Sequence, residues 1–405
     1  MHVLYIHQYY TTPISSGGVR SYHISKSLVE AGHNVEIITT SAFSPKSWVL
    51  GVGWNIKFVD GVKVNVLNLS YSNKMGFFMR IWTFILFSLR ATLKACQTKC
   101  DVIYATSTPL TIAIPGVLAS KYHKVPMVFE VRDLWPEIPI ALKALKSPMT
   151  IYLARKLEQW AYKNSKRIVA LSPGMADGVA KLGYPKDAIS IIPNFSDVDM
   201  FSDASPHDFR VQNQWLAERR LVVYTGTFGK VNGLAYLVEV ASAMLHIDST
   251  VCFVLIGDGA EKNDLENLAI KRGVLNTNLY FLPPVSKCEL PNVLAASDIC
   301  VSTVLPVPEL WHNSANKFFD ALAAGKPVAI NHYGWQADAI NDEGIGVVMN
   351  PESPKDGALS LSNALSDNKW LADAGRKATE LARNKYSLKK LVSSVEVVLK
   401  NSLVG

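Results

Sequence analysis

Two charged side chains, Lys317 and Asp320, stand one helical turn apart in a segment that has the pattern of a short helix. Asn316 suits the N-cap of that helix, and Gly325 followed by Pro327 suits its end before a Val-Ala-Ile strand. A lysine in the first turn opposes the positive end of the helix dipole unless an anion lies between them. Asp320 could accept hydrogen bonds from the hydroxyls of a ribose. The segment therefore predicts a nucleotide site, with a solvated lysine and a locally paired aspartate as the alternative.

Glycine-rich turns after other apolar runs add candidates for anion binding. Gly17 and Gly18 follow the first run, and Gly226 precedes Lys230 in the second half of the chain. Lys262 follows a Gly-Asp-Gly turn. Glycine lets the backbone approach a ligand closely, and a lysine beside it supplies positive charge. We predict phosphate contact at the Gly226 turn, with Lys262 as a second candidate cation. The Gly17-Gly18 turn lacks the Gly-x-Gly-x-x-Gly fingerprint, and the alternative there is a turn that binds no ligand.

A basic and an acidic residue, Arg132 and Asp133, directly follow the strand-like run Val125–Val131. Open parallel sheets bind their ligands at the carboxyl ends of the strands, so this pair stands where a reacting sugar would lie. The alternative is a local ion pair between the two side chains with Trp135 packed beside it.

The sequence argues against a metal centre and against serine-hydrolase chemistry. No set of His, Cys and carboxylate residues has metal-ligand spacing, and no Gly-x-Ser-x-Gly elbow is present. Asp197 and Asp199 match an Asp-x-Asp metal-diphosphate pattern, but they lie in a linker, so we expect them to be structural.

The elements that must position these residues alternate between short apolar runs and helix-length segments, which is the pattern of parallel sheets. We expect an α/β chain of two domains, residues 1–200 plus 386–405 and residues 201–385, in which the last helical segment returns to the first domain. The expected strands are Val3–His7, Val35–Thr39, Val62–Leu67, Val102–Ala105, Val125–Val131, Ile168–Leu171, Leu221–Tyr224, Val251–Ile256, Leu279–Leu282, Ile299–Ser302, Pro327–Ile330 and Gly346–Val348.

Composition narrows the function classes. The 405 residues are 49% hydrophobic and 19% charged, which predicts a folded globular protein. A net charge of +7 without a zinc-finger spacing or an aromatic-interleaved basic motif favours phosphates or an anionic membrane over nucleic acid. The five cysteines are odd in number and form no Cys-x-x-Cys pattern, which favours reduced, mostly buried thiols in the cytoplasm. The chain begins directly as a strand, so no signal peptide is expected.

The segment Met75–Ala95 is strongly apolar, but Arg80 and Arg90 leave too short an uncharged stretch to span a membrane. Two interpretations remain open. The segment is either a buried helix of the first domain or an interfacial helix whose aromatics insert while Lys74 and Lys94, with the arginines, meet anionic headgroups.

With these residues in view, the chain resembles retaining glycosyltransferases of family 4, which have the GT-B fold, over nearly its whole length. The order of the shared features is the specific part of the resemblance. The features are Gly17-Gly18, Asp133, the Ile-Pro-Asn linker with Asp199 and Phe201, Gly226, Gly257-Asp-Gly259, Ala296-Ser-Asp298 and the block ending at Pro327. The details look most like bacterial surface-polysaccharide (O-antigen or capsule) enzymes, including N-acetyl-L-fucosamine transferases.

The resemblance implies two Rossmann-like, doubly wound domains facing a central cleft, with the nucleotide sugar held by the C-terminal domain and the acceptor by the N-terminal one. It implies metal-independent transfer with retention from a UDP-sugar, without a cofactor, to a lipid-linked (undecaprenyl diphosphate) saccharide. Such an enzyme would be cytoplasmic and peripherally associated with the inner face of the plasma membrane. The implied catalytic residues are Asp133, Arg132 and Gly18. The implied donor-binding residues are Gly17, Gly226, Thr227, Lys230, Lys262, Pro284, Val285, Glu309, His312, Ser314, Ala315, Asn316, Lys317 and Asp320.

The chain departs from the family pattern at charged positions. The usual pair of glutamates separated by seven residues falls on His312 and Asp320, and the usual His before the first-domain Asp is Arg132. The usual Arg and Lys of the first nucleotide-domain loop are missing, so Lys230 and Lys317, with Lys262, are expected to meet the phosphates. These substitutions keep two alternatives open, a nucleotide-sugar 2-epimerase on the same fold and a non-catalytic nucleotide-sugar-binding protein.

Overall fold

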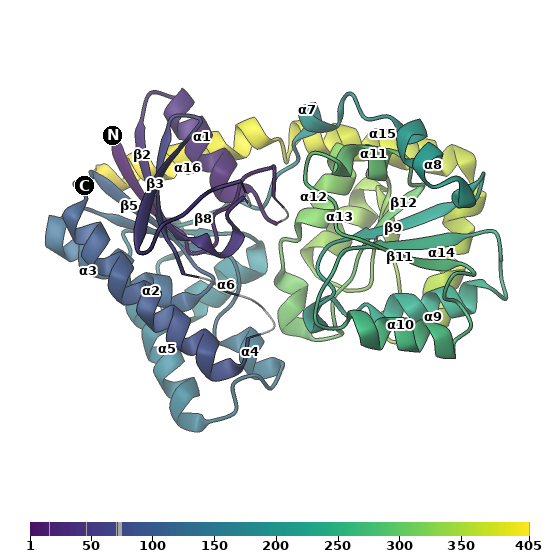
Figure 1. Ribbon diagram of the computed structural model, residues 1–405, viewed down its shortest axis with the longest axis horizontal. Helices are drawn as coiled ribbons and strands as arrows, with labels where there is room; N and C mark the ends of the chain where they lie inside the picture. Colours follow the sequence, from purple (N-terminus) through teal and green to yellow (C-terminus); the bar gives the residue numbers. More distant parts are fainter. Residues whose placement is uncertain (16, 46, 70, 72–74, 405) are drawn as a thin grey trace. The chain divides into compact units, whose positions relative to one another are not determined.

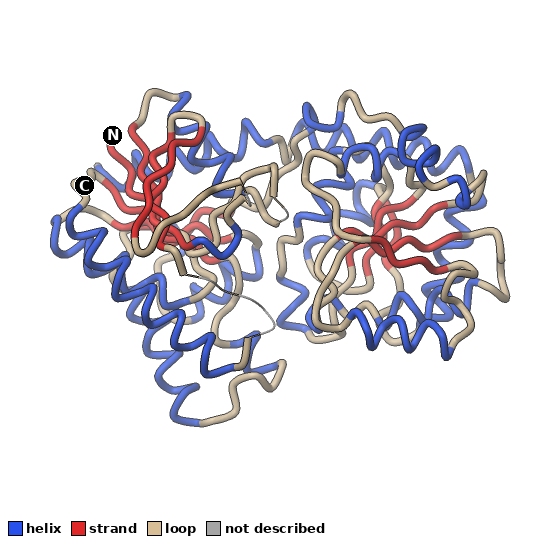
Figure 2. The backbone as a smooth tube through the Cα atoms, viewed as in Figure 1, coloured by secondary structure: helices blue, strands red, loops and turns tan. Residues whose placement is uncertain are grey.

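The computed structural model describes residues 1–15, 17–45, 47–69, 71 and 75–404. It divides into two compact units, Met1–Pro193 with Lys389–Gly405, and Asn194–Leu388. Each unit contains a sheet of mainly parallel strands with helices on both faces (Figures 1 and 2), which confirms the predicted doubly wound α/β class. The first unit ends earlier than residue 200 because the chain after Pro193 is bonded within the second unit, where Ser196 donates to the Phe319 carbonyl.

The first unit contains an eight-stranded sheet in the order β3-β4-β2-β1-β5-β6-β7-β8. All neighbouring strands are parallel except β3, which runs antiparallel to β4. The strands are β1 His2–Ile6, β2 Asn34–Thr40, β3 Trp54–Val59, β4 Val62–Leu67, β5 Val102–Thr106, β6 Met127–Val131, β7 Arg167–Ala170 and β8 Ile189–Ile191. The helices are α1 Arg20–Glu30, α2 Phe77–Gln97, α3 Ala113–His123, α4 Glu137–Ala141, α5 Pro148–Lys163, α6 Pro173–Lys181 and α16 Leu388–Leu403.

Helices α2, α3 and α5 cover one face of this sheet, and α1 and α16 cover the other (Figure 1). On the last helix, α16, the apolar residues Leu391, Val395 and Leu399 are buried. Glu396 on the same helix accepts a 2.8 Å hydrogen bond from His33, just before β2. These contacts confirm that the C-terminal helix returns to the N-terminal domain.

The second unit contains a six-stranded parallel sheet in the order β11-β10-β9-β12-β13-β14. Its strands are β9 Leu221–Thr225, β10 Cys252–Ile256, β11 Leu279–Leu282, β12 Ile299–Ser302, β13 Val328–Ile330 and β14 Gly346–Val348. Its helices are α7 Val198–Phe201, α8 Pro206–Gln212, α9 Ala235–Met244, α10 Lys262–Lys271, α11 Leu290–Ala295, α12 Asn316–Ala323, α13 Trp335–Glu343, α14 Pro354–Ser366 and α15 Asn368–Asn384. The strand order reverses between β9 and β12, so their carboxyl ends form the switch point at which such sheets bind ligands.

Every strand expected from the sequence is present to within two residues. The sequence did not predict β3, an edge strand whose residues are all partly or largely exposed, or β8, which has only three residues. A short apolar run inside a polar stretch gives little periodic signal.

The N-cap predicted for α12 was wrong. Ala315 occupies the N-cap position, and Asn316 is the first helical residue. The preceding loop is fixed by other polar side chains, since Asn313 accepts a 3.0 Å hydrogen bond from the Ala315 N–H. The predicted helix end is confirmed, because Gly325 adopts a left-handed φ of +64° directly after α12.

Three further expectations concern the cysteines, the apolar segment Met75–Ala95 and the absence of a membrane-spanning helix. The five cysteines form no disulfide, but only Cys252 and Cys300 are buried and Cys288 is exposed, so the expectation of mostly buried thiols was wrong. Helix α2 has the position expected for Met75–Ala95, and Phe87 is fully buried in the core. Lys74 lies outside the described residues. Within the described ranges, no helix combines the length and apolar character needed to cross a membrane.

Candidate active site

The loops after β9 and β12 are joined to each other at the switch point of the second unit. The Leu305 N–H donates to the Val231 carbonyl at 3.0 Å, and Thr303 Oγ1 donates to the Asn232 carbonyl at 2.7 Å. Gly233 allows this close approach, because a Cβ there would lie 2.9 Å from the Val304 and Leu305 backbone. These hydrogen bonds therefore hold the two loops together at the carboxyl edge of the sheet.

Lys317 extends from the first turn of α12 to the Gly226 turn after β9. A Cβ on Gly226 would lie only 2.7 Å from Lys317 Cε and 3.1 Å from Nζ, and Gly226 has a φ of +146° that disfavours any other residue. A second glycine, Gly257, packs against the Gly226 carbonyl, where a Cβ would clash at 1.8 Å. The structure thus brings together the lysine and the glycine turns that the sequence indicated separately.

The surroundings of Lys317 contain little to neutralise its charge. Its Nζ lies 3.5 Å from Asn232 Oδ1 and 5.0 Å from the centre of the Tyr224 ring. Burial lowers the pKa of Lys317 to about 8, although the Asp320 carboxylate opposes the shift. An ammonium group held in this way gains most when an anion arrives.

Asp320, predicted to bind ribose hydroxyls, has an ionic partner that the sequence did not indicate. Lys287, which follows β11, places its Nζ 2.5 Å from Asp320 Oδ1, and both side chains are mostly buried. The alternative of a paired aspartate therefore holds in part, although the partner is distant in sequence and not local. A ribose would have to share the carboxylate with Lys287.

The other predicted lysines stand on neighbouring loops. Lys230 is exposed at the start of the turn that follows Gly229. Lys262 begins α10 and lies 4.0 Å from Glu266. Burial and Asp264 raise the pKa of Glu261, whereas Lys230 lowers it. The Glu261 N–H donates to the Phe228 carbonyl at 3.0 Å, which holds the start of α10 against the loop that carries Lys230.

The remaining predicted donor residues divide into exposed and structural positions. Pro284 and Thr227 are exposed and Val285 is partly buried, while the Thr227 carbonyl accepts from the Tyr224 hydroxyl at 3.0 Å. Ser314 is buried, and its Oγ accepts a 3.0 Å hydrogen bond from the Asn194 N–H. This contact fixes Ser314 as part of the loop scaffold.

Glu309 and His312 lie in the short 3₁₀ helix Pro308–His312, which precedes α12. The indole of Trp335 donates to the Asn313 carbonyl at 2.9 Å and ties this segment to the start of α13.

Unpartnered buried polar atoms gather beside this segment, and sequence reasoning missed them. Within the described part of the chain, both amide atoms of Gln336 and the Nε2 of His332 have no hydrogen-bond partner, although both side chains are fully buried. The Nε1 of Trp311 is unpartnered as well. Trp311 meets the Tyr333 ring edge to face at 5.3 Å, so these groups belong to one region. Buried polar groups of this kind ordinarily have a partner, which a ligand can supply.

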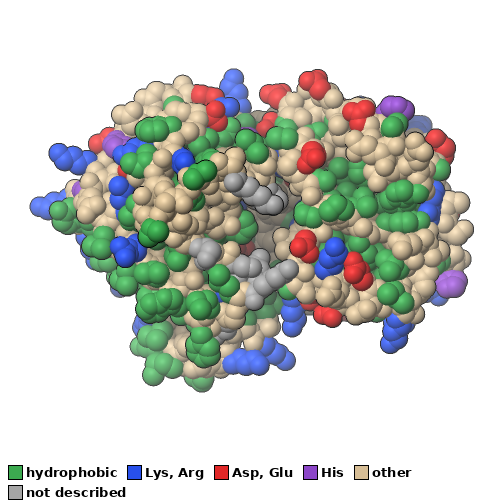
Figure 3. All heavy atoms as spheres, viewed as in Figure 1, with side chains coloured by type: hydrophobic (Ala, Val, Ile, Leu, Met, Phe, Trp, Pro, Cys, Tyr) green, Lys and Arg blue, Asp and Glu red, His purple; other side chains and the backbone are tan. Residues whose placement is uncertain are grey.

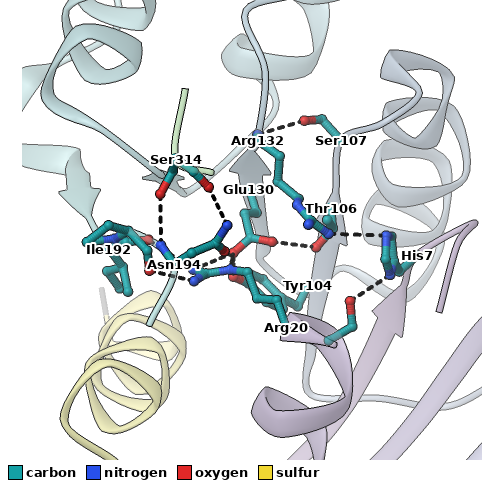
Figure 4. A network of polar contacts seen from close by, with 12 residues as sticks. His7, Arg20, Tyr104, Thr106, Ser107, Glu130, Arg132, Ile192, Asn194 and Ser314 are labelled. Atoms are coloured by element: carbon teal, nitrogen blue, oxygen red, sulfur yellow. Dashed lines mark hydrogen bonds and ion pairs between the residues drawn. The ribbon is translucent and has the colours of Figure 1, made fainter. Parts of the chain in front are cut away.

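In the first unit, the Arg132 side chain extends to His7 (Figure 4). An Arg132 nitrogen lies 3.5 Å from His7 Nε2, and His7 Nδ1 lies 2.6 Å from Ser21 Oγ at the start of α1. Arginine can only donate, so Nε2 accepts and the imidazole proton is assigned to Nδ1. Burial and Arg132 both lower the pKa of His7, which keeps the ring neutral. His7 follows β1 directly, and its position after a strand was the signal that sequence reasoning missed.

Asp133 has a hydroxyl partner in place of the local arginine. Thr108 Oγ1 donates to Asp133 Oδ2 at 3.2 Å. Burial raises the pKa of Asp133, while Arg132 and the Thr108 hydrogen bond lower it, and the net shift is upward. A carboxylate with a raised pKa is a better proton acceptor than an ordinary aspartate. Gly17, with a φ of +132°, and Gly18 lead into α1 in the same unit.

Arg20, the cation nearest the first glycine turn, is buried and belongs to a structural network (Figure 4). Its Nε donates to Glu130 at 2.9 Å, and its terminal nitrogens donate to the Ile192 and Pro193 carbonyls at 3.0 and 2.6 Å. Tyr104 donates to the same carboxylate at 2.6 Å. Arg20 therefore anchors the end of the first unit and is not a ligand contact.

Comparisons with known proteins agree with this geometry. A model described as a glycosyl transferase 4-like domain matches residues 17–194, and a model described as glycosyl transferases group 1 matches residues 207–381. The chain is a glycosyltransferase. The transferase thus carries one recognised domain in each unit, and the lysine and glycine turns of the second unit lie in its group 1 domain.

Its relatives are distant in sequence. It is 24% identical over 285 residues to a protein named as a colanic acid biosynthesis glycosyl transferase, WcaI, of Escherichia coli, covering 67% of this chain and 69% of that protein. It is 26% identical over 393 residues to a D-inositol 3-phosphate glycosyltransferase of Salinispora tropica, covering 91% of this chain and 78% of the relative. The match to the 2-deoxystreptamine glucosyltransferase of Streptomyces kanamyceticus, at 22% identity, covers 55% of this chain and only 59% of the relative.

Solved structures establish the GT-B fold. HepE of Anabaena, in complex with UDP and glucose, superposes with a TM-score of 0.74 at 17% identity, covering 99% of this chain and 100% of that chain. WaaG, a glycosyltransferase involved in lipopolysaccharide biosynthesis, gives a TM-score of 0.71 at 17% identity, covering 98% and 99%.

Proposed function

We propose that this transferase moves a sugar from a UDP-sugar to a lipid-linked saccharide in bacterial surface polysaccharide biosynthesis, with retention at the anomeric carbon and without a metal. The acceptor class is a saccharide on undecaprenyl diphosphate, and the enzyme works at the inner face of the plasma membrane. The relatives named for colanic acid and for lipopolysaccharide core biosynthesis support this biological role. The solved complexes of a structural neighbour with UDP and with UDP-glucose support the donor class.

The observation that carries the proposal is the half-buried Lys317, whose ammonium group is held against the Gly226 turn. As the bond from the anomeric carbon to the diphosphate breaks, negative charge grows on the phosphate oxygens. A preorganised cation at a helix start stabilises that charge. Lys230 and Lys262 add positive charge on neighbouring loops, which is why the proposal needs no metal to bind the diphosphate.

In the first unit, we assign proton transfer to Asp133 or to the leaving phosphate itself. The acceptor hydroxyl forms the new bond on the same face that the diphosphate leaves, and its proton passes to one of these groups. Arg132, oriented by His7, supplies positive charge beside Asp133.

The donor sugar is proposed to be N-acetyl-L-fucosamine or a related amino sugar. Gln336 supports this choice, because a side-chain amide can donate to an acetamido carbonyl and accept from its N–H. His332 and the Glu309–His312 segment complete the proposed sugar pocket in the second unit.

The test is a thermal-shift screen of UDP-sugars followed by a transfer assay with the best donor, with and without a chelator. We expect UDP-linked N-acetylated deoxysugars to stabilise the protein most, transfer to survive the chelator, and the product to keep the donor's anomeric configuration. Release of an epimerised nucleotide sugar without an acceptor would show that the 2-epimerase alternative is correct. An inverted product, or activity lost with the chelator and restored by a divalent ion, would overturn the mechanism.

A further inference from the structure

Four aromatic rings meet in the first unit where the chain leaves β1 and β2. The Tyr9 ring meets Phe43 edge to face, with ring centroids 5.5 Å apart, and its centroid lies 5.1 Å from that of Tyr71. Phe84 of α2 stacks on Tyr71 at 5.8 Å. All four side chains are partly exposed, and we call them the aromatic cluster. Because β1 and β2 are neighbouring parallel strands, the cluster lies at the carboxyl edge of the sheet, where such folds bind ligands.

Arg80 adds a cation beside the aromatic cluster. It lies one turn before Phe84 on α2, and the fully buried Phe87 follows on the same side of the helix. Arg80 is therefore on the inner side of α2, opposite Trp82 and the other exposed apolar side chains that gather over the lower part of the first unit (Figure 3).

The charge of Arg80 has no counter-ion in the described part of the chain. Its Nε is buried without a hydrogen-bond partner, and its guanidinium group forms no ion pair with a described residue. Buried polar atoms ordinarily have a partner, and the planar guanidinium group matches the paired oxygens of a carboxylate or a phosphate. The missing partner of Arg80 is therefore best supplied by an oxyanion.

Further buried polar atoms without a partner lie on the two loops that carry Tyr9 and Phe43. Among the described residues, neither amide atom of the fully buried Gln8 has a hydrogen-bond partner, and Thr12 Oγ1 and Ser44 Oγ have none. The two loops are joined, since Thr11 Oγ1 donates to the Phe43 carbonyl at 2.9 Å. An amide and hydroxyls can both donate and accept, which suits the hydroxyl groups of a sugar.

The loop after β5 connects this region to the proposed proton acceptor. Its Thr108 donates to Asp133 at 3.2 Å, and three residues later Thr111 has a buried Oγ1 without a described partner. The Thr111 carbonyl accepts a 3.2 Å hydrogen bond from Ser88 of α2. One loop thus joins Asp133 to the helix that carries Arg80, so a sugar bound at the aromatic cluster has the proton acceptor at the same edge of the sheet.

We propose that the aromatic cluster and Arg80 bind the acceptor sugar, and that the acceptor carries an oxyanion, a carboxylate or a phosphate, which Arg80 holds. The apolar face of the sugar ring lies on the aromatic rings, and its hydroxyls meet the unpartnered polar groups beside them. The oxyanion is either a substituent of the sugar or part of the diphosphate that links it to the lipid. This inference rests on the proposed function, because it assumes transfer to a saccharide, and it adds which residues read the acceptor and which charge they select.

The test is an NMR-monitored titration of the full chain, saturated with UDP, with four soluble probes. Methyl β-glucoside is neutral, methyl β-glucuronide carries a carboxylate, and methyl β-glucoside 6-phosphate carries a phosphate ester. The fourth probe, glucose linked through a diphosphate to citronellol, carries its charge in the linkage alone. Arg80→Gln removes the cation, and Arg90→Gln, at an exposed arginine of the same helix, is the matched control.

We expect wild type and Arg90→Gln to bind at least one anionic probe about 10- to 150-fold more tightly than methyl β-glucoside, the range for a charge-assisted hydrogen bond. Arg80→Gln should lose this preference, and Arg80→Lys should keep part of it. Tyr9→Leu should weaken neutral and anionic probes alike, because it removes a ring and no charge. Preference for the glucuronide or the 6-phosphate would place the oxyanion on the sugar, and preference for the diphosphate probe alone would place it in the linkage.

Three outcomes would overturn the inference. They are equal binding of neutral and anionic probes by wild type, a preference that survives Arg80→Gln, and an equal loss in Arg90→Gln. The first needs no variant, so it decides the matter even where a substitution impairs folding. The thermal shift with UDP reports on the second unit and should match wild type in every variant. A wild type without that shift would count against the proposed donor, so the two failures are distinguishable.

Discussion

Replacing Lys317 by methionine tests the donor-site assignment most directly. Methionine keeps most of the apolar volume against Tyr224 but removes the ammonium group that reaches the Gly226 turn. A charge-assisted hydrogen bond contributes roughly 1.5 to 3 kcal/mol, which corresponds to a loss of about 10- to 150-fold in kcat/KM for the donor. Lys369→Met, an exposed lysine of α15, is the matched control and should stay at the wild-type value.

The pH dependence gives the same assignment a second readout. With its pKa lowered to about 8 in the free enzyme, Lys317 loses its proton above that pH. Donor kcat/KM of the wild type should therefore fall by about tenfold per pH unit above the pKa, and this limb should be absent in Lys317→Met. Lys317→Arg, which remains protonated, should also lack the limb.

The stability effect has the opposite sign. Folding lowers the pKa of Lys317 from 10.5, so the buried charge destabilises the free protein below pH 8 and the penalty disappears above 10.5. At neutral pH, Lys317→Met should therefore melt at a higher temperature than wild type, yet show a smaller shift with UDP. A variant within threefold of wild-type kcat/KM, or one that keeps the alkaline limb, would refute the phosphate assignment.

Other substitutions probe neighbouring parts of the structure. Gly226→Ala introduces a Cβ at a φ of +146° and against Lys317 Cε, so donor binding should weaken at least tenfold. In a double-mutant cycle with Lys317→Met, the losses in donor-binding free energy should be clearly non-additive. Asp133→Asn should lower kcat at least 100-fold with little change in donor KM if Asp133 accepts the proton, and an unchanged kcat would leave that role to the leaving phosphate. Glu130→Gln leaves Arg20 buried without its counter-charge, so calorimetry should show a free energy of unfolding of the first unit lower by about 3 to 5 kcal/mol. A decrease under about 1 kcal/mol would contradict the ion pair. Burial raises the pKa of Glu158 from 4.5 to about 7, so its contribution to the free energy of unfolding is complete below pH 4.5 and is lost as the pH rises through 7. The loss amounts to roughly 3 kcal/mol, and Glu158→Gln should remove it. A profile of stability against pH that this substitution leaves unchanged would refute the raised pKa.

The features of the proposed donor site that the sequence predicts depend on residues that lie close together along the chain. The conflict between Lys317 and the helix dipole involves residues within one turn, and the glycine turns follow apolar runs whose strand pattern is clear. The switch point then brings the Gly226 turn and α12 to one edge of the sheet, because parallel strands end at the same side.

Contacts between residues distant in sequence account for what was missed. Lys287 is 33 residues from Asp320, and nothing in either segment indicates the pair. The N-cap was misplaced because Asn313 and Ser314 fix the loop before α12 through their own hydrogen bonds. Gln336 and His332 stand out only once their burial is known, since their sequence neighbourhood is that of an ordinary strand-to-helix loop.

Arg20 and Lys317 show why a residue type alone does not identify an anion site. Arg20 follows a glycine turn, but Glu130 lies 2.9 Å from it, and that carboxylate raises the pKa of Arg20 against the effect of burial. Its charge is already balanced, so an incoming phosphate would gain little from it. Lys317 faces an aromatic ring and an amide oxygen, and the Asp320 carboxylate on the next turn is ion-paired with Lys287. Its pKa is lowered, which means that folding has removed water from the ammonium group without supplying a full counter-charge. Arg20 thus has a carboxylate of its own, whereas Lys317 does not, and Lys317 is the cation that we propose a diphosphate stabilises.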